Sequence, residues 1–208
     1  ADSDTILETI HTSSKDFFLY QVEGNFSQPN IYTCQNMIEF ARSLCSQKQD
    51  VDLLELYCGS GTFTICLADL FRKTLATEVS RVPTATALLN IKKNNISNTK
   101  IARLSAVEVA EALTGVREFN RLKREDIDIT SYNFDTLLID PPRSGLEFQQ
   151  ARDFTAQFEH IIYVSCGPKS LVEDLSYLYK THEIKNLAFF DQFPYTEHLE
   201  TIVELIKR

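Results

Sequence analysis

The chain has 208 residues, with 21 Lys or Arg and 29 Asp or Glu, so its formal net charge is −8. Its 43% hydrophobic and 24% charged residues are typical of a globular protein and exclude wholesale disorder. No apolar run approaches the roughly 18–20 residues of a membrane span, and no signal-like N-terminus is visible. The five cysteines lack C-x-x-C spacing, which argues against a disulfide framework or a zinc ribbon. We therefore expect a cytoplasmic protein with no membrane association and no metal.

Residues 1–48 are predicted to form an extended segment followed by a helix. Gln28-Pro29-Asn30 ends the extended segment and introduces the helix, over 31–46. We treat this part as leading into one domain that comprises residues 49–208.

From residue 51 onward, short apolar runs alternate with amphipathic stretches, which is typical of a parallel α/β sheet. The clearest helices are expected where apolar residues recur at three- and four-residue spacing, over 81–94 and 169–179. The apolar runs predict seven strands, over 51–57, 74–79, 101–104, 134–140, 160–165, 184–190 and 199–206. The predicted fold class is therefore α/β, with a mostly parallel sheet and helices on both faces.

A polar stretch over 114–132 interrupts this alternation and combines several cations with Phe119. One interpretation is a solvated helix with charge pairs at i,i+4 spacing. The other is an insertion that faces RNA, in which Arg121 and its neighbours contact phosphates and Phe119 stacks on a base. On the second interpretation, Phe119 and Arg121 are candidate substrate-binding residues.

The first strand of the α/β part leads into a glycine-containing turn, Tyr57-Cys58-Gly59-Ser60-Gly61. Glycines let the backbone approach a ligand closely, and such a turn before a helix forms a cradle at the carboxyl end of a parallel sheet. Glu78 ends the next strand, where a carboxylate accepts hydrogen bonds from ribose hydroxyls. Only G-x-G is present, so an adenosine-containing ligand without a pyrophosphate is favoured over a dinucleotide. The alternative is a tight turn with a surface acid.

Three further segments end strands with chemically active side chains. In Ile139-Asp140-Pro141-Pro142-Arg143, the two prolines hold Asp140 at the strand tip, and Arg143 is a candidate substrate contact. Cys166 follows a strand and precedes a helix start, which is expected to favour its thiolate form. Glu200 follows an aromatic loop and is a candidate base. The alternatives are an ordinary turn, an inert cysteine and an ordinary entry into a strand.

Together these segments resemble the tRNA uracil-5-methyltransferases, which are S-adenosylmethionine enzymes that make 5-methyluridine in the tRNA T-loop. The resemblance runs from about Phe26 onward and implies a Rossmann-like class I methyltransferase fold, S-adenosylmethionine as cofactor, and tRNA as the partner of a monomer. Family members are longer, with an N-terminal RNA-binding portion, so we expect this chain to be the catalytic domain alone. The motifs, in the family's order, are FSQPN, DLLELYCGSGTF, ATEVSRVP, GVREFNRL, IDPPRSGL, YVSCGP and FDQFPYTEHLET.

The resemblance also implies a role for each matching residue. Cys166 matches the nucleophile that adds to uracil C6, and Glu200 matches the base that removes the C5 proton. The chain departs from the family's pattern with GSGT for GNGN, SCGP for SCNP and EHLE for HHxE, which affects fine positioning. The cofactor contacts implied are Gln28, Tyr57, Gly59, Glu78 and Asp140.

The implied reaction is methylation of the T-loop uridine, position 54 by the tRNA convention, through a covalent adduct between the cysteine and C6. Three alternatives remain open: a ribosomal-RNA uridine methyltransferase, a non-catalytic tRNA-folding module, and an amino-methyltransferase suggested by D-P-P. In the last case Arg143 replaces the aromatic residue that would stack on the target base, and Cys166 has no role.

Overall fold

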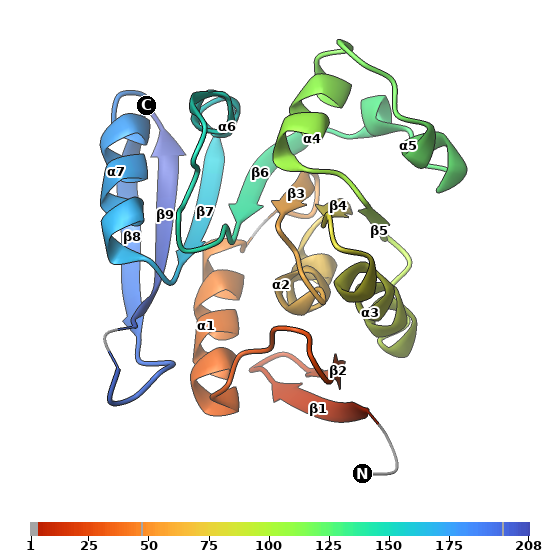
Figure 1. Ribbon diagram of the computed structural model, residues 1–208, viewed down its shortest axis with the longest axis vertical. Coiled ribbons are helices and arrows are strands. Elements are labelled where there is room, and N and C mark those ends of the chain that lie inside the picture. The colour runs from red at the N-terminus through yellow and green to blue at the C-terminus, as the bar shows by residue number, and fades with distance from the viewer. Residues whose placement is uncertain (1–3, 47, 197) are drawn as a thin grey trace.

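The computed structural model describes residues 4–46, 48–196 and 198–208, and its centre is a seven-stranded sheet (Figure 1). The strands are β3 (Asp52–Leu56), β4 (Lys73–Thr77), β5 (Thr99–Ala102), β6 (Phe134–Ile139), β7 (His160–Ser165), β8 (His182–Phe190) and β9 (Glu200–Lys207). Their order is β5-β4-β3-β6-β7-β9-β8, and β9 runs antiparallel to both of its neighbours while the other pairs are parallel. The predicted fold class is confirmed, and each predicted strand is present within two residues of its expected bounds.

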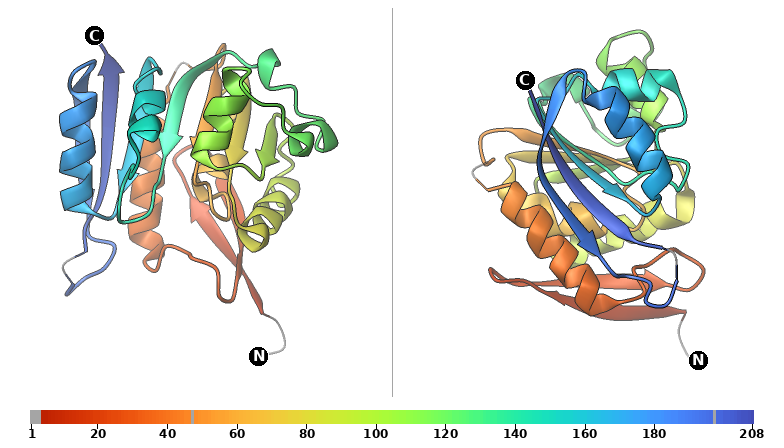
Figure 2. Two further views of the ribbon diagram at one scale, coloured as in Figure 1. Left: turned by 45° about the horizontal axis from the view of Figure 1, so that its top comes forward. Right: turned by 90° about the vertical axis from the view of Figure 1, so that its left-hand side faces the viewer.

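Helices cover both faces of the sheet, as the two views of Figure 2 show. One face carries α1 (Ile31–Leu44), α2 (Thr62–Leu67) and α3 (Arg81–Lys93), with the 3-10 turn η1 (Ala68–Leu70). The other face carries α4 (Ala106–Leu113), α5 (Asn120–Arg124), α6 (Gln149–Thr155) and α7 (Pro168–Leu178), with the 3-10 turn η2 (Ile129–Ser131). Within the described residues, none of these helices has the length and apolar character needed to cross a membrane.

Successive side chains of a strand point to opposite faces, so each central strand contributes to two cores. Leu54 of β3 belongs to the buried cluster that contains Val109 of α4 and Leu171 of α7. Its neighbour Leu53 belongs to the second cluster, which contains Met37 of α1. The second core therefore joins a helix that precedes residue 48 to the sheet that follows it.

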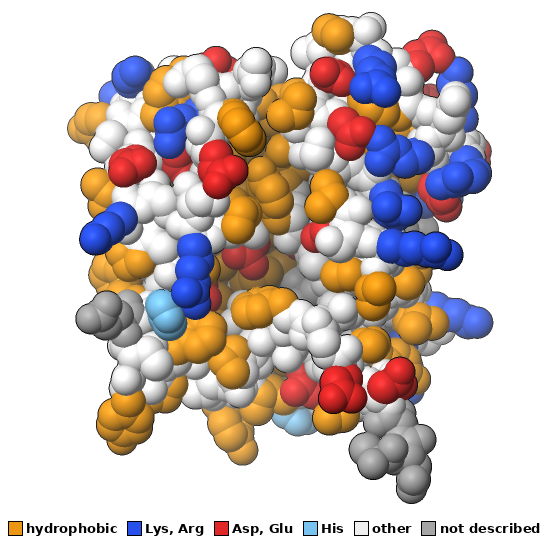
Figure 3. All heavy atoms as spheres, viewed as in Figure 1, with side chains coloured by type: hydrophobic (Ala, Val, Ile, Leu, Met, Phe, Trp, Pro, Cys, Tyr) orange, Lys and Arg blue, Asp and Glu red, His pale blue; other side chains and the backbone are white. Residues whose placement is uncertain are grey.

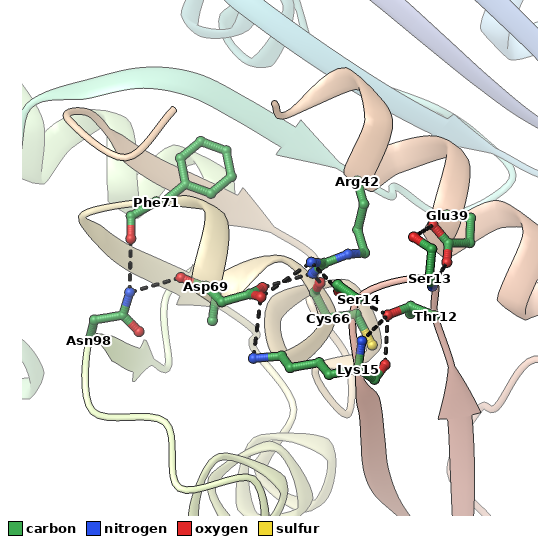
Figure 4. A network of polar contacts seen from close by, with 11 residues as sticks. Thr12, Ser13, Ser14, Lys15, Glu39, Arg42, Cys66, Asp69, Phe71 and Asn98 are labelled. Carbon is green, nitrogen blue, oxygen red and sulfur yellow. Dashed lines mark hydrogen bonds and ion pairs between the residues drawn. The ribbon is translucent and has the colours of Figure 1, made fainter. Parts of the chain in front are cut away.

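The N-terminal segment is a β-hairpin, whereas the sequence predicted a single extended segment. Strands β1 (Thr5–His11) and β2 (Asp16–Val22) pair antiparallel and lie beside α1 and α3. Arg42 of α1 is buried and anchors the hairpin turn (Figure 4). Its guanidinium donates to the Asp69 carboxylate at 2.7 and 3.2 Å and to the Ser14 hydroxyl at 2.8 Å. One buried arginine thus ties the hairpin turn to η1.

Asn90 of α3 and Asn94, which caps the end of this helix, bind the backbone of β2 as a neighbouring strand would. Asn94 accepts from the Phe18 N–H at 2.9 Å and donates to the carbonyl of the same residue at 2.6 Å. Asn90 accepts from the Tyr20 N–H at 2.7 Å and donates to the Tyr20 carbonyl at 3.4 Å. The Asn90 amide also donates to the Ser60 carbonyl at 3.0 Å. The hairpin, α3 and the glycine turn therefore meet at one side chain.

Candidate active site

A cleft of about 560 Å³ opens at the carboxyl ends of β3, β4, β6 and β7. Figure 3 shows it as a central hollow with acidic side chains at its base and apolar side chains around it. Because β9 is antiparallel, its first residue lies at the edge where the parallel strands end. Of the ten residues predicted from the sequence to form the site, eight line the cleft: Gln28, Tyr57, Gly59, Glu78, Asp140, Arg143, Cys166 and Glu200.

The glycine turn has a left-handed backbone and closes onto Glu78. Gly59 and Gly61 have φ of 54° and 84°, and Tyr57 has φ of 62°, which costs a non-glycine residue on the order of 1 kcal/mol. The Glu78 carboxylate accepts from the Gly59 N–H at 3.2 Å and from the Ser80 N–H at 2.7 Å. The acid predicted to bind a ribose is therefore fixed against the turn. The sequence did not reveal the left-handed conformation of Tyr57.

A second, smaller cavity of about 210 Å³ adjoins the cleft and shares Tyr57, Glu78 and Pro142 with it. The rest of its lining is mainly apolar and includes Val79, Leu104, Ala106, Val107 and Phe148. A ligand that joins a flat apolar ring to a polar part would therefore fit both cavities, with the ring in the smaller one and Glu78 between the two parts.

Several carboxyl groups in the cleft are held in surroundings that favour their neutral forms. Burial raises the pKa of Asp140 to about 8, and the nearby Glu200 adds to this effect. Burial also raises the pKa of Glu200 to about 7, against the opposing effect of Arg143. Glu55 also lines the cleft but was not predicted from the sequence, although it is the acid between Leu54 and Leu56 at the end of β3. Its burial raises its pKa to about 8, although it accepts a hydrogen bond from the Thr64 hydroxyl at 2.5 Å.

This concentration of acids suits a cationic organic ligand, because a positive charge beside them favours their ionised forms. Among the described residues, Arg143 is the only Lys or Arg that lines the cleft. The described residues contain no group of three or more His, Cys, Asp or Glu placed to hold a metal ion.

The expectation that the helix start favours a Cys166 thiolate is wrong. Burial raises the pKa of the Cys166 thiol, and the Glu200 and Asp140 carboxylates raise it further. A hydrogen bond from Arg143 acts in the opposite direction without overcoming them. The first residue of the following helix, Pro168, has no N–H to present to the sulfur.

We therefore expect Glu200→Gln to make Cys166 more reactive toward iodoacetamide, because the substitution removes a negative charge that raises the thiol pKa. The other four cysteines are buried, so a single thiol dominates alkylation. In the alkaline range the rate should rise about two- to fivefold in this variant. Arg143→Gln should slow alkylation. Mass spectrometry of the alkylated peptide against pH measures both, and identical pH profiles for the two variants would contradict this electrostatic account.

The loop that carries Arg143 is fastened to the start of α7. The Ser170 hydroxyl donates to the Arg143 carbonyl at 2.7 Å, and the buried Asp174 carboxylate accepts from the Leu146 N–H at 2.8 Å. Gly167 makes this approach possible, because a Cβ there would lie 2.6 Å from the Arg143 carbonyl oxygen. The glycine after the cysteine therefore has a packing role in this chain.

The structure does not bring the two remaining candidates into the cleft. Phe119 is only 5% exposed and belongs to the core beneath α4–α7, so the prediction that it stacks on a base is wrong. Arg117 and Arg121 lie over its ring, 4.8 and 5.8 Å from the centroid. Arg121 pairs with Glu108 and donates to the Arg103 carbonyl at 2.6 Å, outside the residues that line the cleft.

Comparison with known proteins identifies the family. The model of the tRNA (Uracil-5-)-methyltransferase family matches residues 1–208. The chain belongs to this family. The resemblance expected from the motifs is thereby confirmed over the whole chain, including the hairpin that precedes them.

Curated relatives of this family align with nearly all of the chain. The tRNA/tmRNA (uracil-C(5))-methyltransferase of Neisseria meningitidis serogroup B (strain MC58) is 46% identical over 207 residues, covering 99% of this chain and 56% of the relative. The enzyme of the same name from Teredinibacter turnerae is 47% identical over 205 residues, covering 99% of this chain and 55% of the relative. The chain thus spans about half the length of these relatives.

A solved structure supports the fold. The Pyrococcus abyssi tRNA (uracil-54, C5)-methyltransferase, in complex with S-adenosyl-L-homocysteine, superposes with a TM-score of 0.73 at 24% identity. The alignment covers 98% of this chain and 44% of that chain. At this identity the similarity establishes the methyltransferase fold, which agrees with the strand order described above.

Proposed function

We propose that this protein transfers a methyl group from S-adenosylmethionine to C5 of the T-loop uridine of tRNA. The observation that supports it most directly is that Cys166 and Glu200 share one cleft with Glu78 and Asp140. The residues proposed as nucleophile and base thus lie beside the acids proposed to hold the cofactor. The names of the Neisseria and Teredinibacter relatives and the family match point to the same activity.

The residues present fit the cofactor. Asp140, supported by Glu55, would accept hydrogen bonds from the cationic amino-acid end, and Glu78 would bind the ribose hydroxyls. Gln28 and the backbone at Gly59 complete the proposed contacts. The apolar cavity beyond Glu78 has room for the adenine ring. When bound, the cofactor supplies an electrophilic methyl group.

Cys166 provides the activation that uracil C5 needs. After the thiol gives its proton to solvent, its sulfur adds to C6, and the electron pair of the C5–C6 double bond moves toward C5 and the O4 carbonyl. Arg143 donates a hydrogen bond to the Cys166 sulfur, which favours the thiolate that makes this addition. The enolate-like C5 would then bond to the methyl group as the bond between that methyl group and the cofactor sulfur breaks.

Glu200 completes the reaction by accepting the proton from C5. The electron pair of that C–H bond restores the C5–C6 double bond, and the C6–S bond breaks to release the thiolate of Cys166. Its pKa of about 7 suits this role, because a general base works best when its pKa lies near the working pH. The target uracil must leave its stacked position in the RNA to reach Cys166 and Glu200.

The RNA backbone would contact the basic side of the molecule. Arginines of α3, of the segment just after β5 and of α5 surround a shallow groove of about 180 Å³, and Figure 3 shows Lys and Arg gathered on this side. We propose that Arg121 and Arg124 contribute to phosphate binding there, while Arg143 contacts the substrate in the cleft. The groove arginines are Arg81, Arg103, Arg121 and Arg124.

Incubation with S-adenosylmethionine and an unmodified tRNA transcript, followed by nucleoside mass spectrometry, tests the proposal. We expect 5-methyluridine in this transcript and none in a matched transcript whose T-loop uridine is replaced by cytidine. Methylation of ribosomal RNA alone would favour the ribosomal alternative and contradict the proposed target. Equal tRNA refolding by Cys166→Ala and the unaltered protein, with no methylation by either, would favour a folding module instead.

A further inference from the structure

Two chain segments that are far apart in the sequence meet beside the cleft. Gln28 precedes α1 and lines the cleft, whereas Gln192 follows β8 in the loop that leads to Glu200. The Gln192 side-chain nitrogen donates to the Gln28 side-chain oxygen at 2.7 Å. Gln192 is only 1% exposed and does not line the cleft. It therefore touches the candidate cofactor site only through another side chain.

The hydrogen bond fixes which end of the Gln28 amide is available to a ligand. Gln192 Oε1 is buried and has no partner among the described residues. Turning both amides over would pair that oxygen but bury the Gln192 NH₂ group, leaving a buried donor unpaired instead of an acceptor. Unpaired buried donors are rarer in folded proteins than under-satisfied carbonyl oxygens. The observed orientation engages the Gln28 oxygen and leaves its Nε2 donor for the cleft.

We propose that Gln192 is a positioning residue for cofactor binding: it holds the Gln28 amide with its NH₂ group toward an acceptor atom of the cofactor. This inference rests on the proposed function, in which Gln28 contacts S-adenosylmethionine. A second contact shows that the Gln192 loop and the start of α1 are held together, since the Thr33 hydroxyl donates to the Asp191 carbonyl at 3.4 Å. That contact provides a matched control.

Calorimetric titration with S-adenosylhomocysteine tests the inference in a double-mutant cycle. In Gln192→Glu, the new carboxylate only accepts, so the Gln28 amide must turn its NH₂ group away from the cleft. We expect affinity to fall about tenfold in the unaltered background and less than twofold in a Gln28→Ala background. Gln192→Met removes the donor without adding charge, and should weaken binding by a smaller factor that also disappears with Gln28→Ala.

Thr33→Val loosens the same loop without touching either amide and should change affinity less than twofold. If Gln192→Glu and Gln192→Met weaken binding equally in both backgrounds, or leave it unchanged while Gln28→Ala weakens it, the positioning role is wrong and the cofactor assignment of Gln28 stands. If Gln28→Ala itself has no effect, that assignment fails, and the positioning role fails with it.

Discussion

Glu200→Gln should accumulate a covalent protein–RNA species that already carries the transferred methyl group. Glutamine has nearly the same shape but cannot accept the C5 proton, so addition and methyl transfer proceed while elimination of the thioether does not. Glu200 is buried and lies in the cleft with Cys166. We expect turnover to fall by at least about 10²-fold, the lower range for loss of a general base. Denaturing electrophoresis with radiolabelled methyl groups measures the trapped species.

Cys166→Ala is the companion variant and should abolish methyl transfer while leaving cofactor binding intact. Without addition at C6, uracil C5 lacks the electron density to accept a methyl group. Normal turnover by Glu200→Gln would contradict the assigned base. A covalent species in the Cys166→Ala/Glu200→Gln double variant would contradict the assigned nucleophile.

Asp174→Ala is expected to cause the largest loss of stability. This carboxylate of α7 is fully buried and accepts from the Tyr163 hydroxyl at 2.6 Å, the Leu146 N–H at 2.8 Å and the Arg152 guanidinium at 2.7 Å. Its removal leaves three hydrogen-bond donors without their acceptor, and one of these donors is charged. The free energy of unfolding should therefore fall by about 3–5 kcal/mol. Urea denaturation followed by circular dichroism measures the loss.

Asp153→Ala is a matched control for this prediction. Asp153 lies on α6 next to Arg152, and it accepts from Tyr177 and Gln149, but it is exposed. Its replacement should change the free energy of unfolding by less than about 1 kcal/mol, as is usual for surface pairs. Similar losses in the two variants would mean that the buried network contributes no more than a surface one.

The central strands β3, β6 and β7 were predictable because they are buried on both faces and are nearly continuous apolar runs. The N-terminal hairpin was not, since its strands are half exposed and pair only with each other. The position of β9 between β7 and β8 depends on which edge the last strand enters, and apolar patterning carries no information about that.

The site was predictable where a residue ends a strand, as Glu78, Asp140 and Cys166 do. The predictions were wrong where the surroundings of a side chain come from other helices and strands. Phe119 is flanked by cations in the sequence, yet the ring is buried and the cations cover it. The pKa of Cys166 is raised partly by acids from two other strands, which no local pattern around the cysteine reveals.

The hydrogen bonds from Asn90 and Asn94 to β2 have a consequence for how this domain can be divided or fused. A chain that began between β2 and α1 would leave the amides of Asn90 and Asn94 without the backbone they bind. Asn90 would then have only the Ser60 carbonyl of the glycine turn to hold it. The Asn90 amide therefore links β2 directly to the glycine turn. The natural unit for transplantation or truncation therefore includes the hairpin, and a linker to another module belongs before β1.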